Sequence, residues 1–354
     1  MGLFSRSRSL VGLDIGSAAI KLVELKEAKK GQGYQLVAFG HEPLSPEAIV
    51  DGAIMDAGLV AETIKKLFAD TKVKTSDVAT SLSGHSVIIK RISLQDMDDA
   101  ALAESIKWEA EQYIPFDIEE VSLDYQRLGS GPENTMDVLL AAVKKEKIAD
   151  YADVIKQSGR TPKLVDIDIF CVQNAFELNY DLPAPNQIQA LINVGASVTN
   201  IAVMQGPQPI FWRDISTGGN QFTEAIQKEL SLSFDQSERL KRGQEVEGIP
   251  LSNAVPIVQS VCEEIGNEIQ KTLDFFKATT VDAPVDRIML SGGSSRVLGF
   301  TAYLNDRFEA PVEVMDPLRN VAKGKDIDVD RLDDIAPSLA VAVGLALRSL
   351  GDKP

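Results

Sequence analysis

Apolar runs broken by small residues open the chain and predict strands joined by tight turns. Residues 10–26, LVGLDIGSAAIKLVELK, form two such runs around a bend, and residues 33–44 form a third. Residues 58–70 then change to a helical period. The apolar stripe of that helix consists of Leu59, Val60, Ile64, Leu67 and Phe68. We therefore expect a β-sheet covered by a helix.

The next stretch alternates strand-like and helix-like patterns and predicts a compact inserted α/β subdomain. Its expected elements are two strands within 76–94, a helix at 98–115, strands near 121–128 and 136–143, and a helix at 145–158, after which a strand at 162–169 follows. The helix at 98–115 is amphipathic and is stopped by Pro115. Trp108 lies in this helix with Tyr113 and Ile114 near its end, and the pattern favours a core position for Trp108.

The second half of the chain repeats the opening pattern. The runs VGLDIGSAAIKLVEL and LINVGASVTNIAVM share an apolar strand, an acid or amide, a glycine, small residues and a second apolar strand. This echo predicts a duplicated, two-lobed protein. The expected subdomains are the first lobe at 1–76 with 161–187, the insert at 77–160, the second lobe at 188–219 with 286–354, and a mainly helical part at 220–285.

Composition narrows the class of protein. The chain has 354 residues and a net charge of −16, which argues against nucleic acid as a partner. Two cysteines and two histidines give no disulfide framework, no zinc spacing and no His-rich metal site. The first ten residues, MGLFSRSRSL, lack the apolar region of a signal peptide. The apolar window 335–350 contains Pro337 and Gly344, so we expect a buried helix there and no membrane span.

Two hairpins are candidates for binding phosphate. In DIGSAAIK, the backbone N–H groups of Gly16, Ser17, Ala18 and Ala19 would form a nest for phosphate oxygens. Asp14 would hold a metal-bound water and Lys21 would reach a phosphate. The alternative is an ordinary hairpin with Lys21 at a strand edge. In NVGASVT, residues Gly195, Ala196, Ser197 and Thr199 would form a facing nest, with Asn193 in the place of the acid.

Three further motifs carry candidate chemistry. SGGSS places Gly292, Gly293 and Ser294 between a buried strand and a helix, where a flat ligand could lie on the backbone. SERLKRG places Glu238 on one helical face with Lys241 and Arg242, as a ligand-binding set or as a solvated ion pair. VDIDIF places Asp166 and Asp168 at a strand end, as catalytic carboxylates or as a cap for a helix.

Together these motifs resemble the actin-like ATPase superfamily, which includes actin, sugar kinases, chaperone ATPases and the division protein FtsA. The resemblance implies an α/β fold of two actin-like (ribonuclease H-like) lobes with an FtsA-type inserted subdomain. It implies ATP and Mg²⁺ as cofactors, bound by the residues named above. ISTGGNQFTEAI, at 215–226, also resembles FtsA and adds Gly218 and Gly219 to the nucleotide site. Asp14 would hold Mg²⁺ through water and Asn193 would touch its water shell, and Asp14 and Asp168 are the catalytic candidates.

Two longer stretches narrow the resemblance to the PilM proteins of type IV pilus assembly. These are IKWEAEQYIPFDIEEVSLDYQRLG and APSLAVAVGLALR. The resemblance implies a cytoplasmic ATP-binding scaffold that binds the cytoplasmic N-terminal tail of the inner-membrane protein PilN, together with other platform proteins. Attachment to the inner membrane would then come through a partner, without direct insertion. The insert would offer the tail an apolar groove or a sheet edge.

One departure from the superfamily pattern bears on activity. The second phosphate motif begins with Asn193 where the superfamily has an aspartate, and Ala196 follows the glycine. Loss of that carboxylate predicts bound nucleotide with slow hydrolysis. Two other functions stay open at this point: a sugar-type kinase using Asp168 or Asp166, and an FtsA-like division protein, although no amphipathic anchor follows the last helix. The sequence does not decide whether the chain forms a homo-oligomer.

Overall fold

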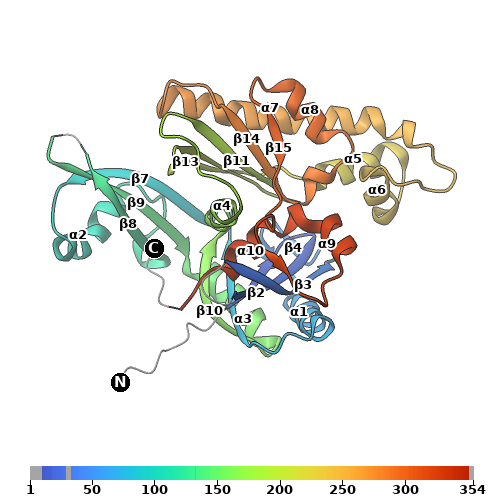
Figure 1. Cartoon of the computed structure of the whole chain (residues 1–354), viewed down its shortest axis with the longest axis horizontal. Helices are drawn as coiled ribbons and strands as arrows, with labels where there is room; N and C mark the ends of the chain where they lie inside the picture. Colours follow the sequence, from blue (N-terminus) through green and yellow to red (C-terminus); the bar gives the residue numbers. More distant parts are fainter. Residues whose placement is uncertain (1–9, 29–32, 132, 351–354) are drawn as a thin grey trace.

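A computed structural model describes residues 10–28, 33–131 and 133–350, and Figure 1 shows two lobes and a lateral insert. The arginines of the opening MGLFSRSRSL lie outside these ranges. The structure is mixed α/β and contains two large sheets and one three-stranded sheet. The two-lobed arrangement with an insert follows the expected pattern, although several boundaries differ.

The first lobe is built on a six-stranded sheet in the order β10-β6-β1-β2-β3-β16. Its strands are β1 (Val11–Ile15), β2 (Ala19–Glu27), β3 (Tyr34–Pro43), β6 (Asp77–Leu82), β10 (Thr161–Ile167) and β16 (Ala322–Lys323). A short hairpin, β4 (Ile49–Val50) with β5 (Ala53–Ile54), follows β3. Helices α1 (Ala57–Thr71) and α3 (Lys145–Gln157) pack against one another and share a core with β1 and β2.

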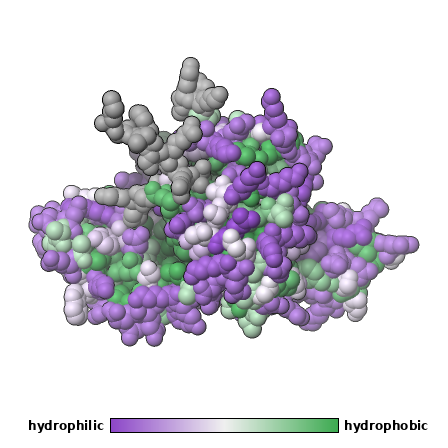
Figure 2. All heavy atoms as spheres, turned by 90° about the horizontal axis from the view of Figure 1, so that it is seen from below, coloured by the Kyte–Doolittle hydropathy of each residue, from purple (hydrophilic) through white to green (hydrophobic). Residues whose placement is uncertain are grey.

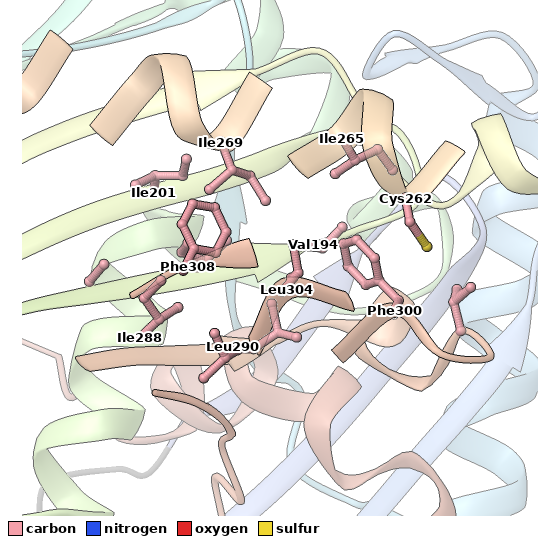
Figure 3. Close-up of a cluster of buried hydrophobic side chains, with 14 of the residues drawn as sticks. Val194, Ile201, Cys262, Ile265, Ile269, Ile288, Leu290, Phe300, Leu304 and Phe308 are labelled. Atoms are coloured by element: carbon pink, nitrogen blue, oxygen red, sulfur yellow. The ribbon is translucent and has the colours of Figure 1, made fainter. Parts of the chain in front are cut away.

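The second lobe is built on a five-stranded sheet in the order β13-β12-β11-β14-β15. Its strands are β11 (Ile188–Val194), β12 (Thr199–Gln205), β13 (Gln208–Ile215), β14 (Arg287–Ser291) and β15 (Val312–Val314). Helices α5 (Asn220–Leu230), α6 (Phe234–Lys241), α7 (Val255–Thr279) and α8 (Phe300–Arg307) accompany it. Figure 3 shows Ile265 and Ile269 from α7, and Phe300 and Leu304 from α8, meeting the sheet residue Val194 in a buried cluster. Burial of this apolar surface stabilises the lobe.

The insert consists of the sheet β7-β9-β8 with helix α2 (Asp99–Glu111) against it. Its strands are β7 (Val87–Gln95), β8 (Val121–Ser130) and β9 (Thr135–Lys144). Leu102, Ile106 and Ala110 turn the apolar side of α2 onto the sheet. The expected core position of Trp108 is wrong, because its side chain is 72% exposed. Trp108 lies two residues after Ile106 and two residues before Ala110, and this spacing places it on the opposite face of the helix.

Four segments lie elsewhere than the expected boundaries place them, among them β16, which pairs with β3 of the first lobe although 286–354 was expected in the second. Strand β6 pairs with β1 and β10 in the sheet of the first lobe, although 77–160 was expected to form the insert. Helix α3 likewise packs on the first lobe. Helix α10 (Ala340–Ala346) was expected in the second lobe, but it contacts β1, β2 and α4 (Asp168–Asn179). Helix α4 was expected only in the alternative that made Asp166 and Asp168 a cap for a helix, and its N-cap residue is Ile167 instead.

Helix α10 packs so closely against α4 and against β1 that each of these two contacts requires a glycine. A Cβ on Gly344 would overlap the carbonyl oxygen of Cys171 in α4, and a Cβ on Gly12 would overlap the carbonyl oxygen of Ala342. Short helix α9 (Val329–Ile335) precedes α10. The buried helix α10 accounts for much of the apolar window 335–350. Among the described residues, no helix is long and apolar enough to cross a membrane.

Candidate functional site

A cavity of about 450 Å³ lies where the two lobes meet, and it gathers most of the predicted site residues. The two hairpins predicted to bind phosphate, β1–β2 and β11–β12, both line it. The predicted residues that line it are Asp14, Gly16, Ser17, Ala18, Ala19, Lys21, Asp168, Asn193, Gly195, Ala196, Ser197, Gly219, Glu238, Lys241, Arg242, Gly292, Gly293 and Ser294. Residues from six separate motifs therefore share one site.

The first hairpin holds an ion pair across its two strands. Asp14 and Lys21 are cross-strand neighbours, and Nζ of Lys21 donates to Oδ2 of Asp14 at 3.1 Å. Both side chains are largely buried in the cavity wall. At the tip, the hydroxyls of Ser17 and Ser197 are 2.8 Å apart and join the two hairpins. Asp14 is thus paired and remains on the cavity surface.

Two predicted site residues do not reach the cavity. The hydroxyl of Thr199 donates to the carbonyl oxygen of Thr217 at 2.8 Å, and Thr199 is fully buried. Gly218 packs against the second hairpin, where an added Cβ would lie 2.6 Å from the carbonyl oxygen of Ala196. Thr199 therefore holds the second hairpin in place, and Gly218 permits its close approach to the segment before α5.

Glycines make the cavity floor where β14 ends. Gly292 has a φ of +90°, and a Cβ there would overlap the carbonyl oxygen of Val194. Gly293 is different, because a Cβ at this position would meet only Ser338 Cβ, at 3.9 Å. A flat ligand can approach the backbone at Gly293 because no side chain intervenes.

Helix α6 supplies a buried charged cluster, so the solvated ion pair is the wrong alternative. Lys241 donates to Glu238, to the Thr223 hydroxyl at 2.8 Å and to the carbonyl oxygen of Gly219 at 3.3 Å. Burial lowers the pKa of Lys241, and Glu238 opposes that shift. Arg242 also contacts Glu238, at 3.6 Å, and stays more exposed. This cluster orients Lys241 and Glu238 at the rim where α6 meets the cavity.

The two aspartates of VDIDIF separate in the structure. Asp168 is the first residue of α4 and lines the cavity, whereas Asp166 pairs with Arg348 outside it. Burial, with the nearby charge of Asp14 as the next contribution, raises the pKa of Asp168 to about 7. A carboxyl group with a pKa near neutrality can accept or donate a proton at physiological pH. Asp168 is thus the better placed of the two for chemistry.

A directional chain of side-chain hydrogen bonds explains why residue 193 is an amide. Asp214 accepts from the backbone N–H of Gly84 at 2.7 Å and from Nδ2 of Asn200 at 2.9 Å. The Asn200 oxygen then accepts from Nδ2 of Asn193 at 2.9 Å, and Asn193 accepts from the Ser291 hydroxyl. Because a carboxylate only accepts hydrogen bonds, Asp214 fixes the orientation of the side-chain amides of Asn200 and Asn193. It therefore requires a hydrogen-bond donor at position 193. Burial raises the pKa of Asp214, and its two bonds oppose that shift.

Sequence reasoning missed several residues of this site. Asn200 and Asp214 carry the chain just described, and the cross-strand pairing of Asn193 with Asn200 would have suggested the first. His41 and Tyr151 also line the cavity. Burial, with the charge of Lys21 next, lowers the pKa of His41 to about 4, so this imidazole is neutral at physiological pH. No sequence motif marks Tyr151, which arrives from α3 through tertiary packing.

A second cavity of about 740 Å³ lies between the insert and the lobes. We call it the groove. One wall consists of β8 and β9, and the other includes α4, the β13 residues Pro209 and Trp212, and the Asp166–Arg348 pair. The residues that line it include Ser122, Asp124, Tyr125, Leu139, Ala141, Phe170, Glu177 and Leu178. Seen from below, apolar atoms gather between the insert and the body of the molecule (Figure 2).

Comparison with known protein families and solved structures identifies this architecture. The pattern of the family described as type IV pilus assembly protein PilM matches residues 12–350. The chain belongs to the PilM family. A solved PilM–PilN type IV pilus biogenesis complex contains a chain that is 28% identical, with a TM-score of 0.84 and coverage of 97% of this chain and 99% of that chain. The family match covers the motifs of both lobes and the insert.

More distant structures share the fold of the PilM family. The ethanolamine utilization protein EutJ from Carboxydothermus hydrogenoformans is 15% identical, with a TM-score of 0.58 and coverage of 97% of this chain and 90% of that chain. MreB5 of Spiroplasma citri, solved with bound ADP, is 13% identical with a TM-score of 0.52, and the match covers 95% of this chain and 94% of that chain. These likenesses show an actin-like fold, and MreB5, a protein of this fold, has been solved with bound ADP.

Proposed function

We propose that this protein is a cytoplasmic ATP-binding scaffold of type IV pilus assembly that captures the N-terminal tail of PilN. The observation that carries the proposal is the inter-lobe cavity, which joins two phosphate hairpins, a glycine floor and the Lys241–Glu238 cluster. The hairpins would hold the phosphates through backbone N–H groups, with Lys21 nearby. The nucleoside would lie over Gly293 and beside α6. Membrane attachment would come from PilN.

The residues present fit a Mg²⁺ ion held mainly by phosphate and water. No group of three or more His, Cys, Asp or Glu side chains that could hold a metal ion occurs among the described residues. Asp14 is the carboxylate of the first phosphate hairpin, and it is already paired with Lys21. Mg²⁺ keeps several waters and takes one or two carboxylates together with phosphates. We therefore propose that Asp14 holds the ion through water and that the ion neutralises phosphate charge.

The amide at 193 supports slow hydrolysis. Asn193→Asp alone would place two carboxylates beside the single NH₂ group of Asn200, so we expect a loss of stability of about 1–3 kcal/mol and no gain in turnover. The double variant Asn193→Asp with Asp214→Asn can reverse the whole chain, because an amide side chain at position 214 would accept from Gly84 and donate to Asn200. We expect this variant to recover stability and to hydrolyse ATP about tenfold faster or more.

Single-turnover assays and urea denaturation test this prediction on the wild type, the two single variants Asn193→Asp and Asp214→Asn, and the double variant. Asp214→Asn alone is the matched control, because it leaves residue 193 an amide and should not raise turnover. A rise in hydrolysis in Asn193→Asp alone would contradict the argument, as would wild-type turnover of about 1 s⁻¹ or more.

The groove supports binding of an extended peptide. Its walls combine exposed polar side chains on β8 with apolar side chains on β9, α4 and β13, and its volume suits several residues of peptide. PilN is the partner named in the related complex. We propose that its N-terminal tail places apolar side chains in this groove.

A bulky side chain on the β8 wall should block the tail without disturbing the nucleotide site. Ser122 is exposed and lines the groove, so Ser122→Trp is expected to weaken binding of a synthetic PilN tail by about tenfold or more. Ser130→Trp is the matched control, because Ser130 is exposed on the same strand outside the groove. Fluorescence anisotropy measures the peptide and calorimetry measures ATP. Equal peptide affinity in both variants would exclude the groove as the binding site.

A further inference from the structure

The sheet of the first lobe has a second end, opposite the inter-lobe cavity. Strands β1, β6 and β10 run parallel and start there, and β2, antiparallel to β1, ends there beside the start of β3. The segment after α1 is tied to β10, because the N–H of Thr161 donates to the carbonyl oxygen of Ser76 at 2.9 Å. We call residues 24–27, 70–77 and 160–163 the basal edge. It lies at the lower end of the first lobe in Figure 1.

The basal edge gathers cations that have no ionic partner. These cations are Lys26, Lys72, Lys74, Arg160 and Lys163. Among the residues that the structure describes, none of the five forms an ion pair or a side-chain hydrogen bond, and all four lysines are exposed. Three carboxylates that can offset them, Glu27, Asp70 and Asp77, share the edge, while Glu24 is buried and accepts from the Thr75 hydroxyl at 2.7 Å. In a chain of net charge −16, this edge is therefore locally basic.

Arg160 gives the basal edge an ordered cation. Its guanidinium carbon lies 4.1 Å from the centroid of the Phe68 ring on α1. Its Nε is buried and has no hydrogen-bond partner within the described parts of the chain. A stacked guanidinium is pre-organised, and its planar set of N–H donors matches the oxygens of a phosphate. Arg160 thus offers a phosphate group a fixed contact between the exposed lysines.

The shape of the basal edge suits an extended anionic surface. Lys163 lies on β10 and Lys26 on β2, with β6 and β1 between them, so their backbones are about 14 Å apart at about 4.8 Å per strand. None of the five cations lines the inter-lobe cavity or the groove. A single phosphate cannot span this distance, whereas neighbouring lipid headgroups can. At physiological salt, charges beyond about 8 Å are screened, so the local excess of cations outweighs the acidic remainder of the protein.

The groove reaches the basal edge. Tyr34 lines the groove and pairs with Glu27, which directly follows Lys26 on β2. Val165 also lines the groove, two residues after Lys163 on β10. A PilN tail that leaves the groove beside Tyr34 would run along the basal edge toward the bilayer that anchors PilN. The basal edge and the anchored partner would then meet the same membrane.

We propose that the basal edge binds the anionic headgroups of the inner membrane and holds the protein with its inter-lobe cavity facing away from the bilayer. The lipid contact is a property of this chain alone, whereas the orientation rests on the proposed function. The contact is electrostatic and inserts no apolar segment. Each lysine or arginine close to an anionic bilayer strengthens binding about fivefold.

Sedimentation with vesicles tests the contact on the full-length protein without PilN. One set of vesicles contains phosphatidylcholine and phosphatidylglycerol in a ratio of about 60 to 40, and the other contains phosphatidylcholine alone. We expect binding to the anionic vesicles only. Raising the salt from about 50 mM to about 0.5 M should weaken that binding about tenfold or more, because the salt screens the exposed cations.

The variant Lys72→Gln/Lys74→Gln/Lys163→Gln, the basal triple, removes three of the exposed cations. We expect its affinity for the anionic vesicles to fall about tenfold or more. Its affinities for ATP and for a synthetic PilN tail should stay within about twofold of the wild type, because none of the three residues lines either cavity.

The variant Lys90→Gln/Lys107→Gln/Lys228→Gln is the matched control. These lysines are also exposed and have no ion pair within the described ranges, and they lie on the insert and the second lobe. The control triple loses the same net charge as the basal triple, so a response to net charge alone would affect both equally. We expect the control triple to bind the vesicles like the wild type.

Four outcomes separate this proposal from its alternatives. No binding of the wild type to anionic vesicles, or an equal loss in both triples, would overturn the lipid contact and leave the proposed function standing. Calorimetric binding of soluble glycerol phosphate with a Kd below about 1 mM, lost in the basal triple, would show a discrete phosphate site instead. Weaker binding of the PilN tail in the basal triple would assign the edge to a partner protein. Vesicle binding without tail binding in the wild type would overturn the proposed function and leave the lipid contact.

Discussion

Gly292→Ala is expected to destabilise the protein by about 2–5 kcal/mol, through backbone strain and overpacking together. Gly292 has a φ of +90°, which an alanine adopts only with strain. A Cβ there would also overlap the carbonyl oxygen of Val194, which belongs to the neighbouring strand β11 and cannot move without breaking the sheet. The loss should appear as a lower melting temperature and a lower urea midpoint with an unchanged denaturant slope.

The adjacent glycine supplies the control and separates stability from binding. At Gly293 the nearest atom to an added Cβ is Ser338 Cβ, at 3.9 Å, so Gly293→Ala should leave the free energy of unfolding within about 0.5 kcal/mol of the wild type. The new methyl would still enter the cavity floor, and we expect ATP affinity to fall about tenfold. A Gly292→Ala protein as stable as Gly293→Ala would show that the turn after β14 can relax.

Asp168→Asn is expected to stabilise the protein above neutral pH, and the gain should disappear as pH falls. The pKa of Asp168 is about 7 in the folded protein, raised by burial and then by Asp14, against about 3.8 for the ordinary side chain. A raised carboxyl pKa means that the folded state holds the proton more tightly. The wild type therefore loses stability as pH rises from about 4 to about 7, and the loss is complete above 7.

The amide removes this ionisation, so its advantage grows through the same window. A full shift of this size corresponds to about 4 kcal/mol, and partial exposure of Asp168 in the cavity reduces the expected gain to about 1–3 kcal/mol. Urea denaturation at pH values of about 5.5, 7 and 8.5 measures it, because these values bracket the upper part of the titration. Asp153→Asn, which removes an exposed pair with Lys156, is the control and should change stability little at any of these values. A gain independent of pH would contradict the raised pKa.

The same substitution also bears on activity. If Asp168 accepts or donates a proton during slow hydrolysis, Asp168→Asn should lower turnover while leaving ATP affinity within about twofold. An unchanged rate would remove Asp168 from the chemistry and leave it as a cavity residue. The sugar-type kinase hypothesis, which relied on this carboxylate, gains no further support from the lining of the cavity.

Local motifs determined much of this protein without a structure. The glycine and serine bends of DIGSAAIK and NVGASVT specify hairpins because only small residues allow the backbone to turn and to approach a ligand. Their echo indicated two lobes, and the chain does have two large sheets with a hairpin from each at one cavity. Alternating and helical periods likewise indicated most strands and helices, because burial on one face imposes these periods.

Tertiary packing decided which of the candidate side chains reach the site. Thr199 and Ser197 belong to one hairpin, yet Thr199 points to Thr217 and Ser197 meets Ser17 of the other lobe. Trp108 looked like a core residue because it is apolar, but the face of α2 that meets the sheet belongs to Leu102 and Ile106. Asp166 and Asp168 were equivalent in sequence until the start of α4 placed one in the cavity and paired the other with Arg348.

The sequence by itself determined that residue 193 is an amide where the superfamily pattern carries an acid; the structure supplied the reason. Asp214 and Gly84 lie far from residue 193 along the chain, and no local pattern relates them. Folding brings Asp214, Asn200 and Asn193 into one hydrogen-bonded chain whose direction is set by the carboxylate. Local residue types set the turns and the periods, because these depend on neighbouring backbone. The pairing of side chains across strands and lobes depends on contacts that only the folded chain creates.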